Sequence, residues 1–208
     1  GVSFWGYDLG GFYNTGYIGN EERPNIEDYL SSVQMGLWMP LSRAHGKTPR
    51  EPWQYGDMAL KEVKKWINFR HRLVPYLYHT ACQSHQSGIP MIRPLVMEYP
   101  KDPIAKIQNL SYMLGDALLI SPGFDRDEYE LYLPEGRWQD IESKEVYEGM
   151  TFVHIENKAF ADGGTSLRVF QKEGTSIPLF AQKDGLDVPG QLWKQEELEF
   201  MTFQNKDV

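Results

Sequence analysis

The sequence has few of the residues from which disulfide frameworks and metal centres are built. It contains one cysteine, Cys82, and five histidines among 208 residues. A lone cysteine excludes an internal disulfide, and we expect Cys82 to be a small core residue. The histidines and carboxylates show no metal-ligand spacing, so we predict neither a metal nor another cofactor.

Positive charge is also scarce. The 21 lysines and arginines are outnumbered by 29 aspartates and glutamates, which gives a formal net charge of -8. Binding to phosphates requires clustered cationic side chains, so the composition argues against a nucleic acid or an anionic membrane as partner. An uncharged substrate fits this balance better.

Long apolar runs are missing as well. No segment is long enough to cross a bilayer, and the first residues lack the charged start and apolar stretch of a signal peptide. Because the chain begins with glycine and enters a strand pattern at once, we expect the native N-terminus and any targeting segment to be absent. The localisation therefore stays open, with the cytoplasm the favoured alternative.

Aromatic residues are plentiful: 6 Trp, 12 Tyr and 10 Phe. Their flat faces stack on pyranose rings, so they suit a sugar site. An aromatic core is the commoner explanation for the same composition. Both interpretations stay open at this point.

The first half of the chain alternates strand and helix patterns. Residues 2–7 form a short apolar run that predicts a buried strand ending at Asp8, and Asn25 is the expected N-cap of a helix that stops before Pro40. A second helix is predicted over 58–86, broken near Pro75 and capped by Gly88. The polar loop over 43–55, the extended segment over 89–98 and the strand over 117–120 complete an α/β rhythm.

The second half changes to short strands with period-two alternation. Strands are predicted over 152–155, 167–170 and 198–201, and turns at Pro134-Glu-Gly, Asp162-Gly-Gly and Asp184-Gly separate the strands of this half. This pattern favours an antiparallel sandwich. The expected boundary between the halves lies between residues 121 and 129.

Asp8 is the first candidate for a functional residue. It stands where a strand ends and its following loop begins, which is where barrel enzymes place their working groups. Gly10 and Gly11 would let the backbone turn sharply there. An aspartate at a strand end is, however, more often a cap or turn residue.

His45 is the second candidate, with Arg43 two residues before it. If the loop of His45 opens on the same face as Asp8, an imidazole donor and a carboxylate acceptor can hold neighbouring hydroxyls of one ligand. Taken alone, each of these residues is more often a solvated loop residue.

Six segments in order resemble glycoside hydrolase family 31, the α-glucosidase and α-xylosidase family, and together they cover nearly the whole chain. The segments are Phe4-Trp-Gly-Tyr-Asp-Leu-Gly-Gly-Phe12; Arg43-Ala-His-Gly46 with Glu51-Pro-Trp53; Arg72-Leu-Val-Pro-Tyr-Leu-Tyr78; Gly88-Ile-Pro-Met-Ile-Arg-Pro-Leu95; Met113-Leu-Gly-Asp-Ala-Leu-Leu-Ile-Ser-Pro122; and Leu133-Pro-Glu-Gly-Arg-Trp138.

The resemblance implies an α/β part followed by an all-β part: the last two strand–helix units of a (β/α)8 TIM barrel over residues 1–125, then an antiparallel β-sandwich over 126–208. It implies a retaining mechanism in which one carboxylate attacks and another protonates the leaving oxygen. Both would lie upstream, so no catalytic residue is expected in this chain. Asp8 and His45 match sugar-binding residues of the family, and Arg43 and Phe12 are expected beside them.

The resemblance leaves the substrate and the activity open. Arg43-Ala-His-Gly46 is closer to the bacterial α-xylosidase-like branch, and both terminal α-linked glucose and xylose stay candidate substrates, with glucose favoured as the broader class. A non-catalytic sugar-binding or structural homologue, or a transglycosylase or lyase on the same scaffold, is the alternative. We expect the isolated chain to be inactive and to self-associate through exposed strand edges.

Overall fold

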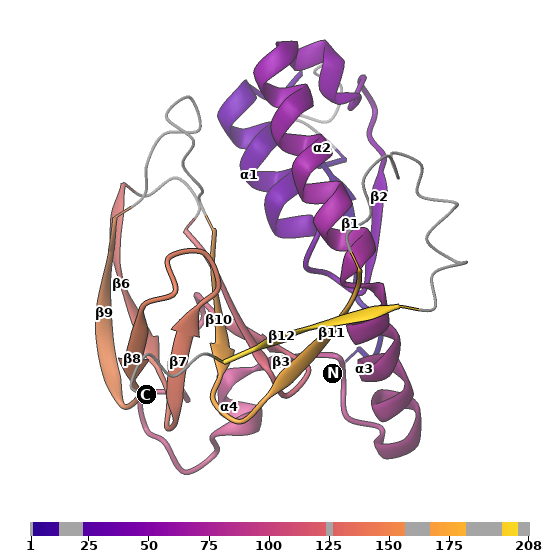
Figure 1. Cartoon of the computed structure of the whole chain (residues 1–208). Helices are drawn as coiled ribbons and strands as arrows, with labels where there is room; N and C mark the ends of the chain where they lie inside the picture. The colour runs from indigo at the N-terminus through magenta and orange to yellow at the C-terminus, as the bar shows by residue number, and fades with distance from the viewer. Residues whose placement is uncertain (1, 13–22, 124–126, 157–166, 182–196, 204–208) are drawn as a thin grey trace.

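A computed structural model describes residues 2–12, 23–123, 127–156, 167–181 and 197–203 of the chain. Figure 1 shows the helices α1, α2 and α3 with the strands β1 and β2 on one side of the molecule, and antiparallel strands on the other. No helix among the described residues is long and apolar enough to cross a membrane.

The N-terminal part is a strand–helix–strand unit. Strand β1 (Gly6–Leu9) pairs in parallel with β2 (Leu41–Ala44), and helix α1 (Ile26–Gly36) connects them. The Asn25 side chain accepts a hydrogen bond from the Asp28 N–H at 2.8 Å, which confirms the predicted N-cap. Leucine, valine and tyrosine side chains of α1 pack on Leu9 and on helix α2 (Gly56–Arg72), which follows the short helix η1 (Pro52–Tyr55).

The predicted break near Pro75 is confirmed. Helix α2 ends at Arg72 and helix α3 (Val74–Ser87) begins after the single residue Leu73. Pro75 lies in the first turn of α3, where its missing N–H costs no helical hydrogen bond. Gly88 adopts φ 76° and its N–H donates to the Ser84 carbonyl at 2.9 Å, so the predicted C-cap is also confirmed.

A six-stranded sheet forms the centre of the C-terminal part, in the order β3-β4-β5-β10-β7-β8 with antiparallel pairing throughout. Its strands are β3 (Ile92–Pro94), β4 (Tyr112–Leu114), β5 (Leu118–Pro122), β7 (Arg137–Asp140), β8 (Val146–Glu148) and β10 (Leu167–Lys172), with the short helix α4 (Leu95–Glu98) after β3. Two further antiparallel pairs are described: β6 (Glu128–Leu133) with β9 (Thr151–Glu156), and β11 (Ser176–Phe180) with β12 (Leu198–Thr202).

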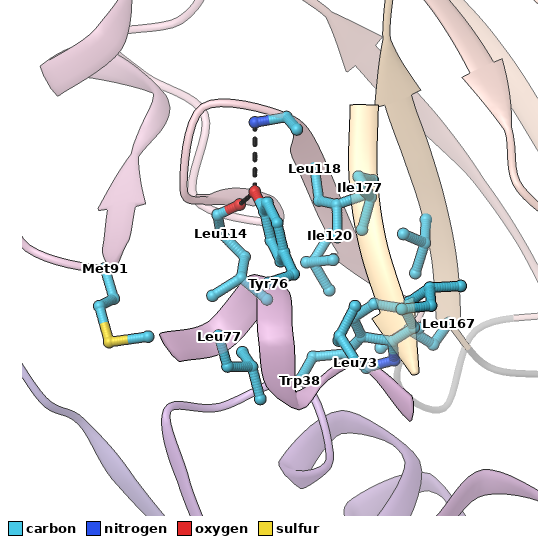
Figure 2. Close-up of a cluster of buried hydrophobic side chains, with 13 residues drawn as sticks. Trp38, Leu73, Tyr76, Leu77, Met91, Leu114, Leu118, Ile120, Leu167 and Ile177 are labelled. Atoms are coloured by element: carbon cyan, nitrogen blue, oxygen red, sulfur yellow. Dashed lines mark hydrogen bonds between the residues drawn. The ribbon is translucent and has the colours of Figure 1, made fainter. Parts of the chain in front are cut away.

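Both faces of this sheet are buried, each against a different layer. Along β5, Leu118 and Ile120 point to one core and Leu119 points to the other, as period-two alternation requires. The first core lies between the sheet, α3 and β11, and Figure 2 shows Leu73, Tyr76 and Leu77 of the helical side against these strands. The second core lies between the sheet and the β6–β9 pair.

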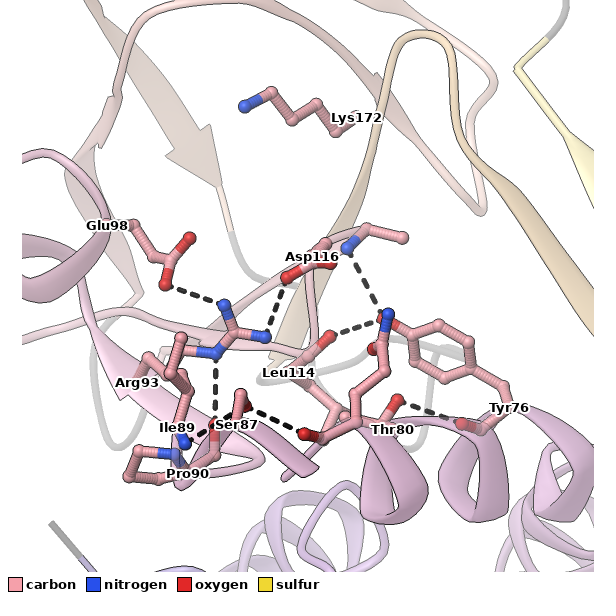
Figure 3. A network of polar contacts seen from close by, with 12 residues as sticks. Tyr76, Thr80, Ser87, Ile89, Pro90, Arg93, Glu98, Leu114, Asp116 and Lys172 are labelled. Atoms are coloured by element: carbon pink, nitrogen blue, oxygen red, sulfur yellow. Dashed lines mark hydrogen bonds and ion pairs between the residues drawn. The ribbon is translucent and has the colours of Figure 1, made fainter. Parts of the chain in front are cut away.

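Polar contacts join α3 to the sheet. The buried Tyr76 hydroxyl donates to the Leu114 carbonyl at 2.6 Å and accepts from the Ala117 N–H at 3.3 Å, and burial raises the pKa of Tyr76 to about 12. Beside it, the Arg93 guanidinium contacts Glu98 and Asp116 at 2.7 Å each (Figure 3). Apart from Glu98, these residues belong to three of the sequence segments noted above, so those segments form a joint between α3 and the sheet.

The residues before β1 are tied to the same joint. The Met91 N–H donates to the Ser3 carbonyl at 3.4 Å, and the Met91 carbonyl accepts from the Gly115 N–H at 2.8 Å. At the other side, the Leu41 N–H donates to the Trp5 carbonyl at 3.1 Å. The segment leading into β1 is therefore held by β2 and by the C-terminal part together.

Three local predictions need correction. The strand predicted over 2–7 is β1 over 6–9, because pairing with β2 begins only at Gly6. The predicted loop over 43–55 starts inside β2, so Arg43 is a strand residue. The segment over 89–98 is extended only at β3 and then turns into α4.

Four predicted strands are confirmed. They are the strands over 117–120 (β5), 152–155 (β9), 167–170 (β10) and 198–201 (β12). The turns at Asp162-Gly-Gly and Asp184-Gly lie outside the described residues.

Candidate functional site

Asp8 and Arg43 form an ion pair across the two parallel strands. They are direct partners in the register of β1 and β2, and Arg43 Nε donates to Asp8 Oδ1 at 2.6 Å. The Asp8 side chain is 23% exposed and that of Arg43 is 69% exposed. The contact fixes one carboxylate oxygen and leaves the Asp8 carboxylate reachable from solvent.

A tight turn follows Asp8. The Gly11 N–H donates to the Asp8 carbonyl at 2.9 Å, and Gly10 and Gly11 have φ values of 82° and 76°. Side chains rarely adopt this left-handed conformation, so the two glycines allow the chain to reverse directly after β1. The predicted sharp turn is confirmed.

Phe12 and His45 meet where the chains leave β1 and β2. Their ring centroids are 5.0 Å apart with an interplanar angle of 51°. The Lys47 N–H donates to the Phe12 carbonyl at 3.0 Å, so the two loops are also joined through their backbones. His45 is exposed, as a ligand-binding imidazole would be.

The structure thus brings the four predicted site residues together as two contacting pairs, Asp8 with Arg43 and Phe12 with His45. Both pairs lie at or just beyond the carboxyl ends of two neighbouring parallel strands. In parallel sheets with helical connections, this end is where ligands bind.

Arg50 is a neighbour of the site that the sequence did not single out. It is buried, and its Nε donates to the Gly11 carbonyl at 2.8 Å, in the turn after Asp8. Its position between the segments Arg43-Ala-His-Gly46 and Glu51-Pro-Trp53 was the available signal, but only the folded chain shows that it reaches β1.

The side chains at this site are of types that can bind hydroxyl groups. It offers a carboxylate acceptor, an imidazole, a guanidinium and an aromatic ring on one edge of a sheet. Among the described residues, no group of three histidine, cysteine, aspartate or glutamate side chains could hold a metal ion.

Two family models match the chain in succession. The first is the glycosyl hydrolases family 31 TIM-barrel domain over residues 1–80, and the second is the glycosyl hydrolase family 31 C-terminal domain over residues 88–184. These matches and the fold therefore define a part of a glycoside hydrolase: a barrel part followed by a β-rich C-terminal domain.

Individual relatives agree with this class. The chain is 32% identical over 179 residues to a 1,6-alpha-glucosyltransferase of Sporosarcina globispora, covering 84% of this chain and 14% of the relative. It is 33% identical over 185 residues to human Neutral alpha-glucosidase AB, covering 86% and 18%. A solved GH31 dextranase of Flavobacterium johnsoniae complexed with glucose superimposes with a TM-score of 0.75 at 31% identity, covering 90% of this chain and 23% of the dextranase.

The chain belongs to glycoside hydrolase family 31. It spans less than a fifth of the length of the two curated relatives above.

Proposed function

We propose that this chain supplies part of the sugar-binding pocket of a retaining α-glycosidase that removes terminal α-linked glucose or xylose from oligosaccharides. The observation that carries the proposal is the position of Asp8 and His45 at the same end of two hydrogen-bonded parallel strands. Glucose is the favoured sugar, because both curated relatives above carry glucose in their names.

The pocket residues suit complementary tasks. With Oδ1 of Asp8 held by Arg43, Oδ2 is available to accept a hydroxyl hydrogen. His45 can hold a neighbouring hydroxyl, and the Phe12 ring beside it provides an apolar surface for the face of a pyranose. Hydrogen bonds of this kind tighten as the sugar ring flattens toward an oxocarbenium ion, so they lower the barrier as well as improve binding.

The two catalytic carboxylates of the retaining mechanism are proposed to lie upstream, on barrel strands outside this sequence. Two features support this. The pair β1–β2 gains no third strand from the described residues, and Phe4, Trp5 and Leu41 expose large apolar side chains around it. Such edges and faces fit a sheet that continues in a longer protein.

The isolated chain is accordingly proposed to be inactive and prone to self-association. We also propose that residues 1–125 provide the last two strand–helix units of the barrel and 126–208 the β-sandwich. The central sheet counts against a boundary as late as residue 125, because β5 pairs in it with β10, and β3 and β4 belong to the same sheet.

Glucosyl transfer is the second candidate, and the 1,6-alpha-glucosyltransferase relative is the observation that favours it. Hydrolysis and transfer share a covalent glycosyl intermediate and differ in whether water or another sugar attacks it. The acceptor side of the pocket would decide between them.

The test uses the longest natural protein that contains this chain, incubated with maltose, an aryl α-glucoside and an aryl α-xyloside. Hydrolysis predicts free glucose or xylose, with the α-anomer appearing first in an NMR time course. Longer oligosaccharides would instead identify transfer, and the absence of any product from all three substrates would favour the non-catalytic homologue. The 208-residue chain alone should release no sugar.

A further inference from the structure

Arg50 connects the two loops that carry the candidate sugar ligands. Its Nε donates to the carbonyl of Gly11, three residues after Asp8, at 2.8 Å. Its Nη1 donates to the carbonyl of Thr48, three residues after His45, at 3.1 Å, and also to the Thr48 hydroxyl. One buried guanidinium therefore hydrogen-bonds to both loops. In each loop the contact lies three residues after the candidate sugar-binding residue.

The Arg50 side chain also occupies the space beside a glycine in each loop. A Cβ atom added to Gly10 would lie 2.8 Å from Arg50 Cδ, and one added to Gly46 would lie 2.8 Å from Arg50 Nε. Carbon atoms do not approach this closely, so both glycines leave room for the arginine. Gly10 is two residues from Asp8, and Gly46 directly follows His45.

Helix α1 holds the backbone of Arg50 through Tyr29. The Tyr29 hydroxyl donates to the Arg50 carbonyl at 2.8 Å, and the Tyr29 ring stacks on Tyr55 with centroids 3.8 Å apart. Burial raises the pKa of Tyr29, so the phenol stays a neutral donor at every physiological pH. Arg50 is thus anchored to a helix, and the loops are anchored to Arg50.

We propose that Arg50 is a positioning residue that sets the spacing between Asp8 and His45, so that both reach hydroxyls of one sugar ring. This inference rests on the proposed function and extends it to a residue that does not touch the sugar. Its effect should appear in the rate, because a displacement of about 1 Å in a binding group can cost roughly a hundredfold in turnover.

The first test compares Arg50→Met with Arg70→Met in the longest natural protein that contains the chain. Arg70 is a matched control, because it also donates to two carbonyls, those of Leu37 and Pro40, but at the opposite end of β2. We expect Arg50→Met to lower kcat/KM by about 10–100-fold and Arg70→Met by less than about threefold, with Arg50→Lys recovering part of the loss. Equal losses for the two methionine variants would overturn the proposal.

A double-mutant cycle asks whether Arg50 acts through Asp8. If it does, adding Arg50→Met to Asp8→Ala should reduce activity little further, because the group being positioned is already gone. Losses that multiply would mean that Arg50 acts independently, and the positioning role would be wrong.

A readout without activity separates this inference from the proposed function. In the longest natural protein that contains the chain, prepared with labelled histidine, the His45 ring signal reports its place beside the Phe12 ring. The signal should shift in Arg50→Met and stay unchanged in Arg70→Met. An unchanged signal in Arg50→Met overturns the positioning role even if Asp8→Ala is inactive. A shifted signal with a fully active Asp8→Ala supports the positioning role and contradicts the proposed sugar site.

Gly46→Ala keeps the test valid if Arg50→Met fails to fold. It deletes no side chain and adds one methyl group against Arg50 Nε. The expected result is the same His45 shift and a smaller loss of kcat/KM. Wild-type values for both would contradict the proposal.

Discussion

Arg43 Nε donates to Asp8 Oδ1 at 2.6 Å, and the two residues face each other in the register of the parallel strands β1 and β2. Because Arg43 is 69% exposed, this pair is worth little to stability, of the order of 0–1 kcal/mol. Its value lies in orientation: it holds the carboxylate at the strand end with one oxygen engaged.

Asp8→Ala should therefore separate function from stability. In the longest natural protein that contains the chain, we expect kcat/KM to fall by about 10²–10³-fold, because a charged hydrogen-bond partner of the reacting sugar is lost. The thermal midpoint should change by no more than about 2 °C. Near-normal activity of this variant, measured with an aryl α-glucoside, would remove Asp8 from the sugar site.

Tyr76→Phe tests the joint between α3 and the central sheet. The change removes a buried hydroxyl that hydrogen-bonds to the Leu114 carbonyl and to the Ala117 N–H. We expect the free energy of unfolding of the chain to fall by about 1–3 kcal/mol, because two buried polar groups lose their partner. Urea denaturation measures this loss.

Tyr78→Phe is the matched control for that change, since Tyr78 lies on the same helix and is 72% exposed. It should alter the unfolding free energy by less than about 0.5 kcal/mol. A similar loss in both variants would mean that the Tyr76 hydroxyl contributes nothing specific to the joint.

The Arg93 cluster should show unequal contributions from its members. Arg93 has a 7% exposed side chain and donates to Glu98, Asp116 and the Pro90 carbonyl, whereas Asp116 is 64% exposed. We expect Arg93→Met to cost about 2–3 kcal/mol, somewhat below the loss for a fully buried pair. Asp116→Asn should cost less than about 1 kcal/mol in the same urea titration. The reverse order would show that Asp116 is the stronger anchor.

His154 makes the β6–β9 pair sensitive to pH. The hydrogen bond from its Nδ1 to Glu130 raises the pKa of His154 above its ordinary value of 6.5, with Glu128 and Glu156 adding to the effect. A raised folded-state pKa stabilises the fold fully below about pH 6.5, and this contribution is lost as the pH rises through the folded pKa.

An NMR titration of the histidine ring measures that pKa directly. The midpoint should lie above 6.5, move back toward it in high salt because the cluster is exposed, and fall in Glu130→Gln. A midpoint at or below 6.5 would contradict the arrangement of the glutamates around His154.

Local signals in the sequence predicted local features well. The Asn25 cap, the break near Pro75 and the Gly88 cap each depend on contacts within a few residues, and all three are present. Strand β2 was missed because its four residues, Leu-Ser-Arg-Ala, show no strand pattern of their own. Their strand character comes from pairing with β1, more than thirty residues away.

The candidate site also contains residues that the sequence indicated and one that it did not. Asp8 and His45 stood out by their place in the sequence and by resemblance, while Arg50 did not, because its importance depends on two glycines in different loops. The strand over 117–120 was predicted as a strand, but its antiparallel neighbours β4 and β10 follow only from the fold.

The hydrogen bonds of Met91 with Ser3 and Gly115 have a consequence for how this family can evolve. A recombination event that imports a foreign C-terminal domain at residue 88 also replaces the lateral support of the segment leading into β1. Exchange of that domain would therefore change the position of Asp8. We expect the two halves to be inherited as one unit and to accumulate compensating substitutions together.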